Sequence, residues 1–142
     1  MMNRLEMIST ELVRSLGEAG AGQRRAAVSA ACEVALASAL VHDDFTKLVL
    51  EKVRSGREVT ADEISHLNSL VEAADDEYFT LQESGDSDDL EYLRHFKRAR
   101  ALSSLAFASK DDSTMSSSES IYEAMAAVDN RDELIAHVVS AL

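Results

Sequence analysis

The chain has 142 residues, 46% of them hydrophobic, which is enough for one domain whose core needs neither metal ions nor disulfides. It contains no proline and a single cysteine, Cys32, so an internal disulfide is excluded and no proline interrupts a helix. The 26 acidic and 14 basic residues give a net charge of −12, which disfavours nucleic-acid binding because phosphates would be repelled.

The N-terminal third predicts two helices joined by a glycine-rich turn. Apolar residues at helical spacing predict the first helix over about residues 3–16, and three glycines between positions 17 and 22 mark the turn after it. The second helix covers about residues 23–41, and most of its apolar residues are alanines. Small side chains let neighbouring backbones approach closely. We therefore expect this helix to lie centrally, with Cys32 as a small buried hydrophobe.

Capping signals delimit the next two helices. The third is predicted over about residues 44–55, with aspartates at its start and Gly56 just past its end. Thr60 and Glu63 have the spacing of a capping box, in which each side chain accepts a hydrogen bond from the backbone amide of the other residue. This box predicts the start of a fourth helix that extends to about Gln82.

The C-terminal part predicts one long helix and two shorter ones. Acidic residues first and basic residues later agree with the helix dipole over residues 87–109. The polar, serine-rich segment 110–118 is predicted to be a mobile loop. Ser116 with Glu119, and Asn130 with Glu133, have capping-box spacing and would begin the last two helices. Residues 1–142 are thus predicted to form an all-α, single-domain bundle of six to seven helices.

No segment indicates a secretory signal or a membrane span. The N-terminus becomes polar and periodic at once, as the sequence from Asn3 to Glu6 shows. The longest apolar stretch, residues 26–41, contains Glu33 and is too short and too weakly hydrophobic to cross a bilayer. We therefore expect a cytoplasmic protein with no membrane partner.

The negative charge is concentrated in residues 58–91. This stretch holds 12 acidic residues and no lysine or arginine, so the remainder, with 14 acids and 14 bases, is neutral. One interpretation is solubility, because an acidic face keeps a small protein dispersed. The other is a basic partner, because a concentrated negative field steers association with a positive surface.

The fourth predicted helix carries a narrow face of carboxylates around one aromatic side chain. At 100° per residue, Phe79 falls on the side opposite the apolar stripe. An exposed aromatic within a charged rim is the composition of an interface anchor. The alternative is that Phe79 packs under the fifth helix or the loop before it. The predicted partner-binding residues are Glu72, Asp75, Asp76, Phe79, Glu83 and Asp86.

The fifth predicted helix carries a basic run at Arg94, Lys97 and Arg98. We expect these side chains to pair with the acids of the fourth helix or to form a solvated face. Phosphate binding is disfavoured, because no aromatic residues are interleaved on that face and the field of the whole protein has the wrong sign.

The strongest candidate for metal chemistry is Glu63 with His66, an E-x-x-H pair at helical spacing. Di-iron helical bundles use this motif twice, together with two further glutamates, whereas here it occurs once. Glu63 is also assigned to the capping box. We therefore assign no metal, no cofactor and no catalytic residue. Glu63 and His66 stay as the alternative, a metal-dependent helical enzyme.

The chain as a whole resembles the small helical immunity proteins of bacterial polymorphic toxin systems. The residues that carry this resemblance are the acidic helix with the segment 78–83 and the alanine-rich helix over residues 92–108. The resemblance implies a cytoplasmic binder that neutralises a cognate toxin, often a basic nuclease, by blocking its active site. Small acidic inhibitors encoded by phages, which mimic nucleic acid, share this character.

The leading hypothesis is a non-enzymatic protein that binds a basic partner through its acidic helix, in its most specific form an immunity protein. A second hypothesis is the metal-dependent enzyme at Glu63 and His66. A third is a structural oligomer, since an apolar face left over on the alanine-rich helix would favour self-association.

Overall fold

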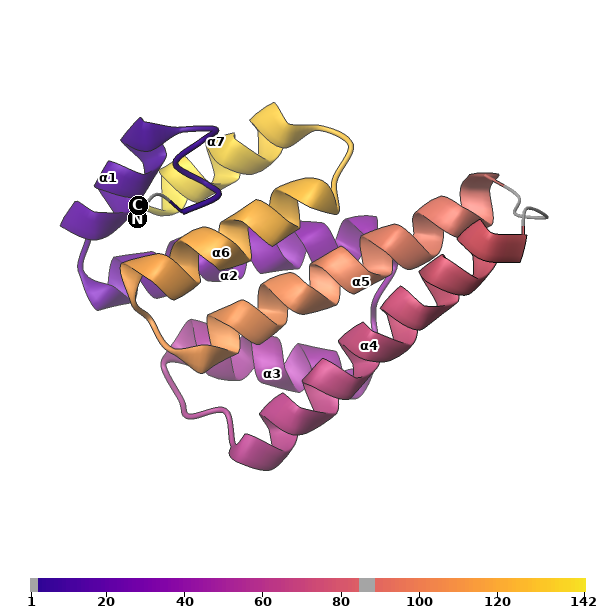
Figure 1. Ribbon diagram of the computed structural model, residues 1–142. Helices are drawn as coiled ribbons and strands as arrows, with labels where there is room; N and C mark the ends of the chain where they lie inside the picture. Colours follow the sequence, from indigo (N-terminus) through magenta and orange to yellow (C-terminus); the bar gives the residue numbers. More distant parts are fainter. Residues whose placement is uncertain (1–2, 85–88) are drawn as a thin grey trace.

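The computed structural model describes residues 3–84 and 89–142 of the chain, and it contains seven helices and no strand within those ranges. The prediction of an all-α bundle is confirmed (Figure 1). The helices are α1 (Thr10–Glu18), α2 (Ala21–Ser38), α3 (Asp44–Ser55), α4 (Ala61–Ser84), α5 (Asp89–Lys110), α6 (Thr114–Ala126) and α7 (Arg131–Ala141). None of the helices in these ranges is long and apolar enough to cross a membrane.

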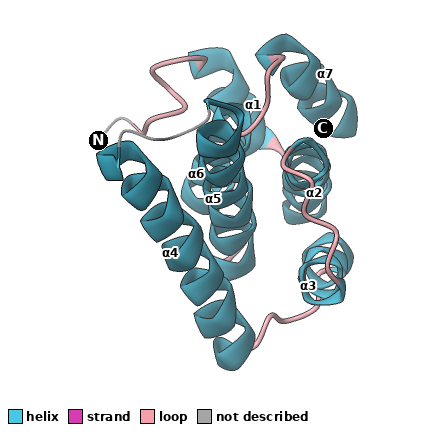
Figure 2. Ribbon diagram, turned by 90° about the vertical axis from the view of Figure 1, so that its right-hand side faces the viewer, coloured by secondary structure: helices cyan, strands magenta, loops and turns pink. Residues whose placement is uncertain are grey.

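Helix α2 occupies the centre of the bundle, as predicted. It contacts α3, α5, α6 and α7, and its alanines and Cys32 are among the most deeply buried residues. Figure 2 shows α4 as an outer layer at the left, α5 and α6 in the middle, and α2 with α3 on the opposite side. The small side chains of α2 permit this crowding because they keep the neighbouring backbones close.

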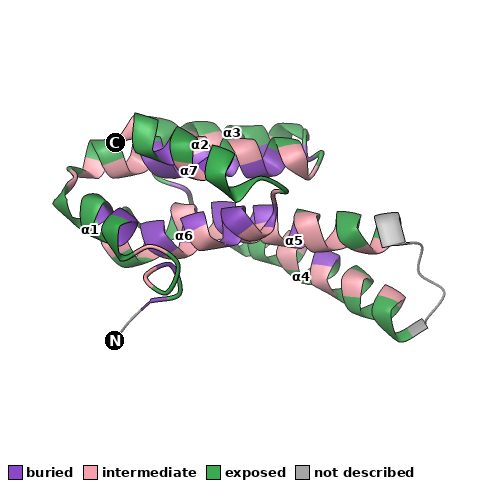
Figure 3. Cartoon of the chain, turned by 90° about the horizontal axis from the view of Figure 1, so that it is seen from above, coloured by how far each residue is buried: buried purple, intermediate pink, exposed green. Residues whose placement is uncertain are grey.

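Helices α4 and α5 form an antiparallel hairpin that projects beyond the other helices (Figures 1 and 3). Helix α4 packs mainly on α5. Its two buried residues among those described are Leu67 and Ala74, and the first buried residue of α5 is Ala99. Between residues 75 and 83, and between 91 and 98, every side chain is therefore at least partly exposed.

Three of the predicted capping signals are confirmed. The Thr60 amide donates to Glu63 Oε1 at 2.9 Å, and the Glu63 amide donates to Thr60 Oγ1 at 3.2 Å. Asn130 Oδ1 accepts from the Glu133 amide at 3.1 Å. Gly56 ends α3 with φ at +72°, in the left-handed region that favours glycine.

The predicted start of the first helix is wrong. The residues before Thr10 form turns instead of helix, and Ser9 caps α1 by accepting the Leu12 amide at 3.1 Å. Asn3 fixes the first turn, since its Oδ1 accepts the Glu6 amide at 2.9 Å. Leu5 is still fully buried, because the turn delivers it to the core. The apolar spacing had therefore identified a buried residue correctly but assigned it the wrong local structure.

Helix α2 ends three residues earlier than predicted. The Val41 amide donates to the Leu36 carbonyl at 2.9 Å and the Leu40 amide donates to the Ala37 carbonyl at 3.1 Å. These two bonds form a Schellman motif, whose turn needs a left-handed residue. Leu40 supplies it with φ at +60°, although its side chain makes that conformation costly. A leucine gave no sequence signal for this stop.

The predicted loop over residues 110–118 is wrong in its bounds, because only residues 111–113 lie outside helices. Helix α5 continues to Lys110 and α6 begins at Thr114, because Ser113 is its cap and accepts the Ser116 amide at 3.1 Å. Ser117 and Ser118 are buried in α6. Serines here serve as small side chains at a helix interface, and their polarity had been interpreted as a loop signal.

Two serines form reciprocal hydrogen bonds between α5 and α6. Ser104 Oγ donates to the Ser120 carbonyl at 2.7 Å, and Ser120 Oγ donates to the Ser104 carbonyl at 2.8 Å. Cys32 Sγ lies 3.4 Å from Ser104 Oγ and 3.6 Å from that of Ser120. Burial raises the pKa of the Cys32 thiol, although the two serine contacts act in the opposite direction. The cysteine is thus a buried packing residue, as predicted, with polar neighbours that were not predicted.

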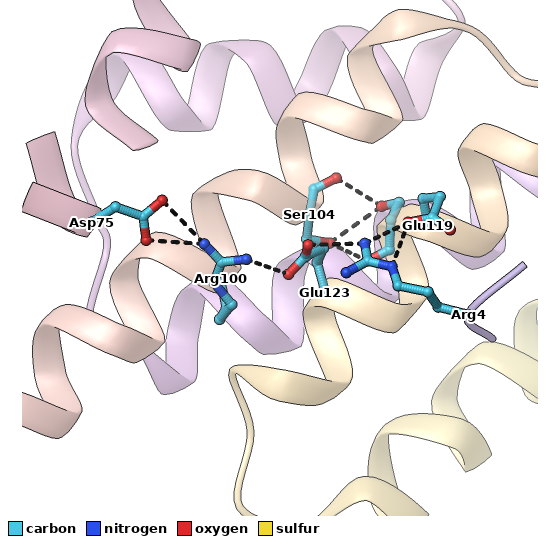
Figure 4. A network of polar contacts seen from close by, with 7 residues as sticks. Arg4, Asp75, Arg100, Ser104, Glu119 and Glu123 are labelled. Atoms are coloured by element: carbon cyan, nitrogen blue, oxygen red, sulfur yellow. Dashed lines mark hydrogen bonds and ion pairs between the residues drawn. The ribbon is translucent and has the colours of Figure 1, made fainter. Parts of the chain in front are cut away.

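A chain of ion pairs links four segments of the protein (Figure 4). Its centre is Glu123 of α6, whose side chain is only 5% exposed. Arg100 of α5 reaches Glu123 at 2.9 Å and donates to both oxygens of Asp75 of α4 at 3.0 and 3.2 Å. Arg4 reaches Glu123 at 3.0 Å and also pairs with Glu119. Because Glu123 is buried, its charge depends on both arginines.

We expect Arg100→Met to lower the free energy of unfolding by about 3 kcal/mol, since it leaves a buried carboxylate short of one counter-charge and a second carboxylate unpaired. The control is Arg54→Met. Arg54 is 47% exposed, and its ion pairs among the described residues are with the exposed Glu33 and Glu51, so its loss should cost less than about 1 kcal/mol. Urea unfolding followed by circular dichroism measures both. Equal losses in the two variants would contradict a structural role for the network.

Candidate partner-binding surface

The exposed side of α4 carries three carboxylates and one aromatic ring. Helical periodicity turns Leu67 and Ala74 into the bundle, and the opposite side faces solvent. The exposed residues on that side of the outer turns are Glu72, Asp76, Phe79 and Glu83, which we call the α4 outer face. Among the described side chains, none forms an ion pair with its three carboxylates.

Phe79 is 55% exposed, so the alternative that it packs beneath α5 is wrong. The other form of that alternative, packing under the loop before α5, falls on residues outside the described ranges. The ring meets only the edge of Tyr78 among the described aromatic side chains, at 5.3 Å between centroids. Tyr78 takes the inward position instead. Its hydroxyl lies 2.7 Å from that of Tyr92, and its ring lies 5.5 Å from that of Phe96. These inner rings hold the hairpin together and leave Phe79 outside.

Asp75 does not belong to the α4 outer face. Asp75 precedes Asp76 by one residue, so its side chain is rotated by about 100° about the helix axis relative to that of Asp76. This rotation directs it toward α5, where Arg100 binds both of its oxygens. Its charge is therefore used inside the protein. Sequence reasoning grouped it with its neighbours because Arg100 had no signal as its partner. Asp86, the remaining predicted residue, lies outside the described residues.

One base of α5 forms an ion pair away from α4, and a second acts electrostatically on α3. Lys97 reaches Asp129, after α6, at 2.8 Å. Arg98 acts on Asp43 at the start of α3. Burial works to raise the pKa of Asp43, but hydrogen bonds from the Thr46 amide and hydroxyl, aided by Arg98, hold it below its ordinary value. Among the described residues, neither base pairs with an acid of α4, so that half of the expectation is wrong, whereas Arg94 and Arg98 are exposed, as expected of a solvated face. The carboxylates of the α4 outer face thus stay without an ion pair to these bases.

The pair Glu63 and His66 lacks the surroundings of a metal site. Lys52 Nζ donates to both oxygens of Glu63 at 2.7 and 2.9 Å, and Oε1 also accepts the Thr60 amide. The His66 ring packs edge-on against Phe45, at 4.5 Å between centroids. In the part of the chain that the structure describes, no three His, Cys, Asp or Glu side chains are grouped to hold a metal ion.

Comparison with protein families, with curated proteins and with solved structures finds no match to this chain. The functional assignment therefore depends on the surface itself.

The Lys52–Glu63 pair predicts a pH dependence of stability. The hydrogen bond from Lys52, followed by that from the Thr60 amide, lowers the pKa of Glu63. A lowered folded-state pKa adds stability above the unfolded pKa of about 4.3, and this is lost as the pH falls through the lower folded pKa. Glu63→Gln should therefore be destabilised most at neutral pH, and its difference from the wild type should close in acid.

The measurement is urea unfolding between about pH 3 and pH 7. Glutamine keeps an oxygen that can accept the Thr60 amide, so the variant removes mainly the charge opposite Lys52. Glu58→Gln is the control, at an exposed carboxylate. If the difference in free energy of unfolding between the wild type and Glu63→Gln stays constant with pH, the stabilising role of the Glu63 charge opposite Lys52 is refuted.

Proposed function

We propose that this protein is a non-enzymatic binding protein whose α4 outer face docks on a basic partner protein. The observation that carries the proposal is Phe79, an aromatic ring 55% exposed among three carboxylates, on a hairpin that projects from the body. A large aromatic at the centre supplies contact area, and the carboxylates around it speed encounter with a positive surface.

Solubility alone explains this surface less well. Dispersing a protein requires net charge but no exposed phenylalanine, and an exposed ring works against it. The acidic residues used internally, among them Asp75, Glu63 and Glu123, do not lie on the α4 outer face. The carboxylates that do lie there have no ion pair with any described residue, so a partner can bind them without displacing an internal base.

In its most specific form, the proposal is an immunity protein of the cytoplasm that neutralises a cognate toxin, such as a basic nuclease. The acidic outer face would then cover a positive active site that otherwise binds phosphates. The small all-α architecture and the absence of a membrane-crossing helix in the described residues are compatible with such a role. The first partner to test is the product of the neighbouring gene, co-expressed with the chain and purified at low and at high salt.

Charge reversal on the outer face should slow association. With the neighbouring gene product as partner, the triple change Glu72→Lys, Asp76→Lys and Glu83→Lys should lower the association rate about tenfold or more at low salt, with a smaller effect at high salt. The control reverses three exposed acids elsewhere, Glu18, Glu58 and Asp132, for the same change in net charge. Failure to form any complex, or equal rates in the two triple variants, would refute the proposal.

Phe79→Ala separates binding from stability. Because the ring is more than half exposed, the free energy of unfolding should change by less than about 1 kcal/mol. Loss of an interface anchor, in contrast, costs about 2 kcal/mol of binding, roughly a thirtyfold weaker Kd that appears mainly in the dissociation rate. Leu48→Ala on α3, an apolar side chain 46% exposed, is the control and should leave Kd unchanged. Surface plasmon resonance and urea unfolding measure the two quantities.

A further inference from the structure

A cavity of about 440 Å³ lies at the end of α4 opposite to the outer face. It is bounded by the first turns of α2, the end of α3, the connection to α4, the first turn of α4, the end of α5 and the start of α6. These segments meet at the same end of the bundle in Figure 1. The volume falls within the range of small-molecule sites, which is about 300–1,000 Å³.

The floor of the cavity is apolar and branched. Val28, Val53 and Val59 line it, and each is less than 9% exposed. Ile64 and Ala108 add half-buried sides. Valines from three different segments thus form a surface suited to a compact hydrocarbon group. Such a group would cover the valine side chains and remove more of their apolar surface from water.

The acids at the rim are mostly satisfied by internal donors. Asp112 binds Arg25 at 3.1 Å. Asp111 accepts the Ser113 amide at 3.0 Å, and hydrogen bonds from Ser113 and Ser116 lower its pKa and keep it charged at the start of α6. Of the acidic lining residues, Glu58 alone has neither kind of partner among the described residues.

Two bases at the rim keep their charge available. Arg57 donates to the neutral Ser55 Oγ at 3.0 Å, and the Lys110 ammonium lies 5.5 Å from the centroid of the Phe107 ring. Neither forms an ion pair with any residue in the described ranges. The rim therefore holds two positive charges outside ion pairs, those of Arg57 and Lys110, and two negative ones, those of Glu58 and Asp111. The Asp111 carboxylate already accepts hydrogen bonds from Ser113 and Ser116, so the unused charged donors at the rim belong to Arg57 and Lys110.

Gly56 is part of the construction of this rim. A Cβ at this position would come within 3.1 Å of Arg25 Nε, and φ is +72°. Glycine thus lets the Arg25 guanidinium lie across the end of α3, where it meets Asp112. This contact neutralises an acid that would otherwise repel an anion from the cavity.

We propose that the cavity binds a small monocarboxylate with an apolar body. Arg57 and Lys110 hold the carboxylate, and the hydrocarbon part rests on the valine floor. The outer face does not prevent this, because Glu72 lies 11 helical residues beyond Ala61 at the cavity, roughly 16 Å away, and the Debye length is about 10 Å at 0.1 M salt. A ligand with one negative charge fits better than a ligand with two, since Glu58 and the charged Asp111 both oppose additional negative charge.

Phenylacetate is the probe for the test, with amide resonances of the full chain followed by NMR. Saturable shifts are expected in residues 56–61 and 108–112. Phenylacetamide, which has the same body without the charge, should bind at least about tenfold more weakly, because charge-assisted hydrogen bonds are the stronger ones. Equal affinity for the two compounds, or no saturable shift with phenylacetate, overturns the proposal.

Two variants tie the binding to the cavity. Arg57→Gln with Lys110→Gln should weaken phenylacetate binding about tenfold or more, whereas Arg14→Gln with Lys47→Gln, the same loss of charge at exposed positions, should not. Ala61→Phe, at an exposed lining residue, should fill the cavity and abolish binding while the helical spectrum is kept. Unchanged binding in either variant refutes the site. The triple lysine variant of the outer face should bind phenylacetate normally, so this test is independent of partner binding.

Discussion

The buried carboxylate of Glu123 is the constraint on which the arrangement of this bundle depends. An ion taken out of water must be surrounded by counter-charge, and Glu123 obtains it from Arg100 on α5 and from Arg4 near the N-terminus. Arg100 also binds Asp75 of α4. One charge in α6 thus fixes the N-terminal segment, the base of the hairpin and the register of α5 against α6. The reciprocal serine bonds at Ser104 and Ser120 act at the same interface.

Much of the fold could be predicted from the sequence because its signals are local. The capping box at Thr60, the cap at Asn130 and the glycine after α3 each involve residues within a few positions of one another. The polar contacts of the core could not be predicted in this way. Arg4 and Glu123 are 119 positions apart, and nothing in the spacing of either residue indicates the other. The prediction of a loop at the serines of α6 failed for a related reason, since serine is common both in turns and at tight helix contacts.

The candidate site also has a part that local spacing predicts and a part that depends on distant residues. Periodicity placed Phe79, Glu72, Asp76 and Glu83 correctly on one exposed side of α4, because a helix face follows from spacing alone. It could not separate Asp75 from them, since that distinction depends on Arg100, 25 positions away. The valine-floored cavity had no sequence signal at all. Its lining comes from five helices and the connections between them, and its available charge depends on which acids find internal donors.

The projecting hairpin has a consequence for how the molecule opens. Side chains between residues 75 and 83 and between 91 and 98 are all at least partly exposed, so the outer turns bury little apolar surface. Regions of this kind unfold locally at a lower free energy than the body of a domain. Amide hydrogens should therefore exchange with solvent in a gradient along the two helices, slowest at the Asp75–Arg100 contact and faster toward residues 83 and 91. A partner that binds the outer turns would suppress this local unfolding, and protection against hydrogen exchange would extend outward along both helices.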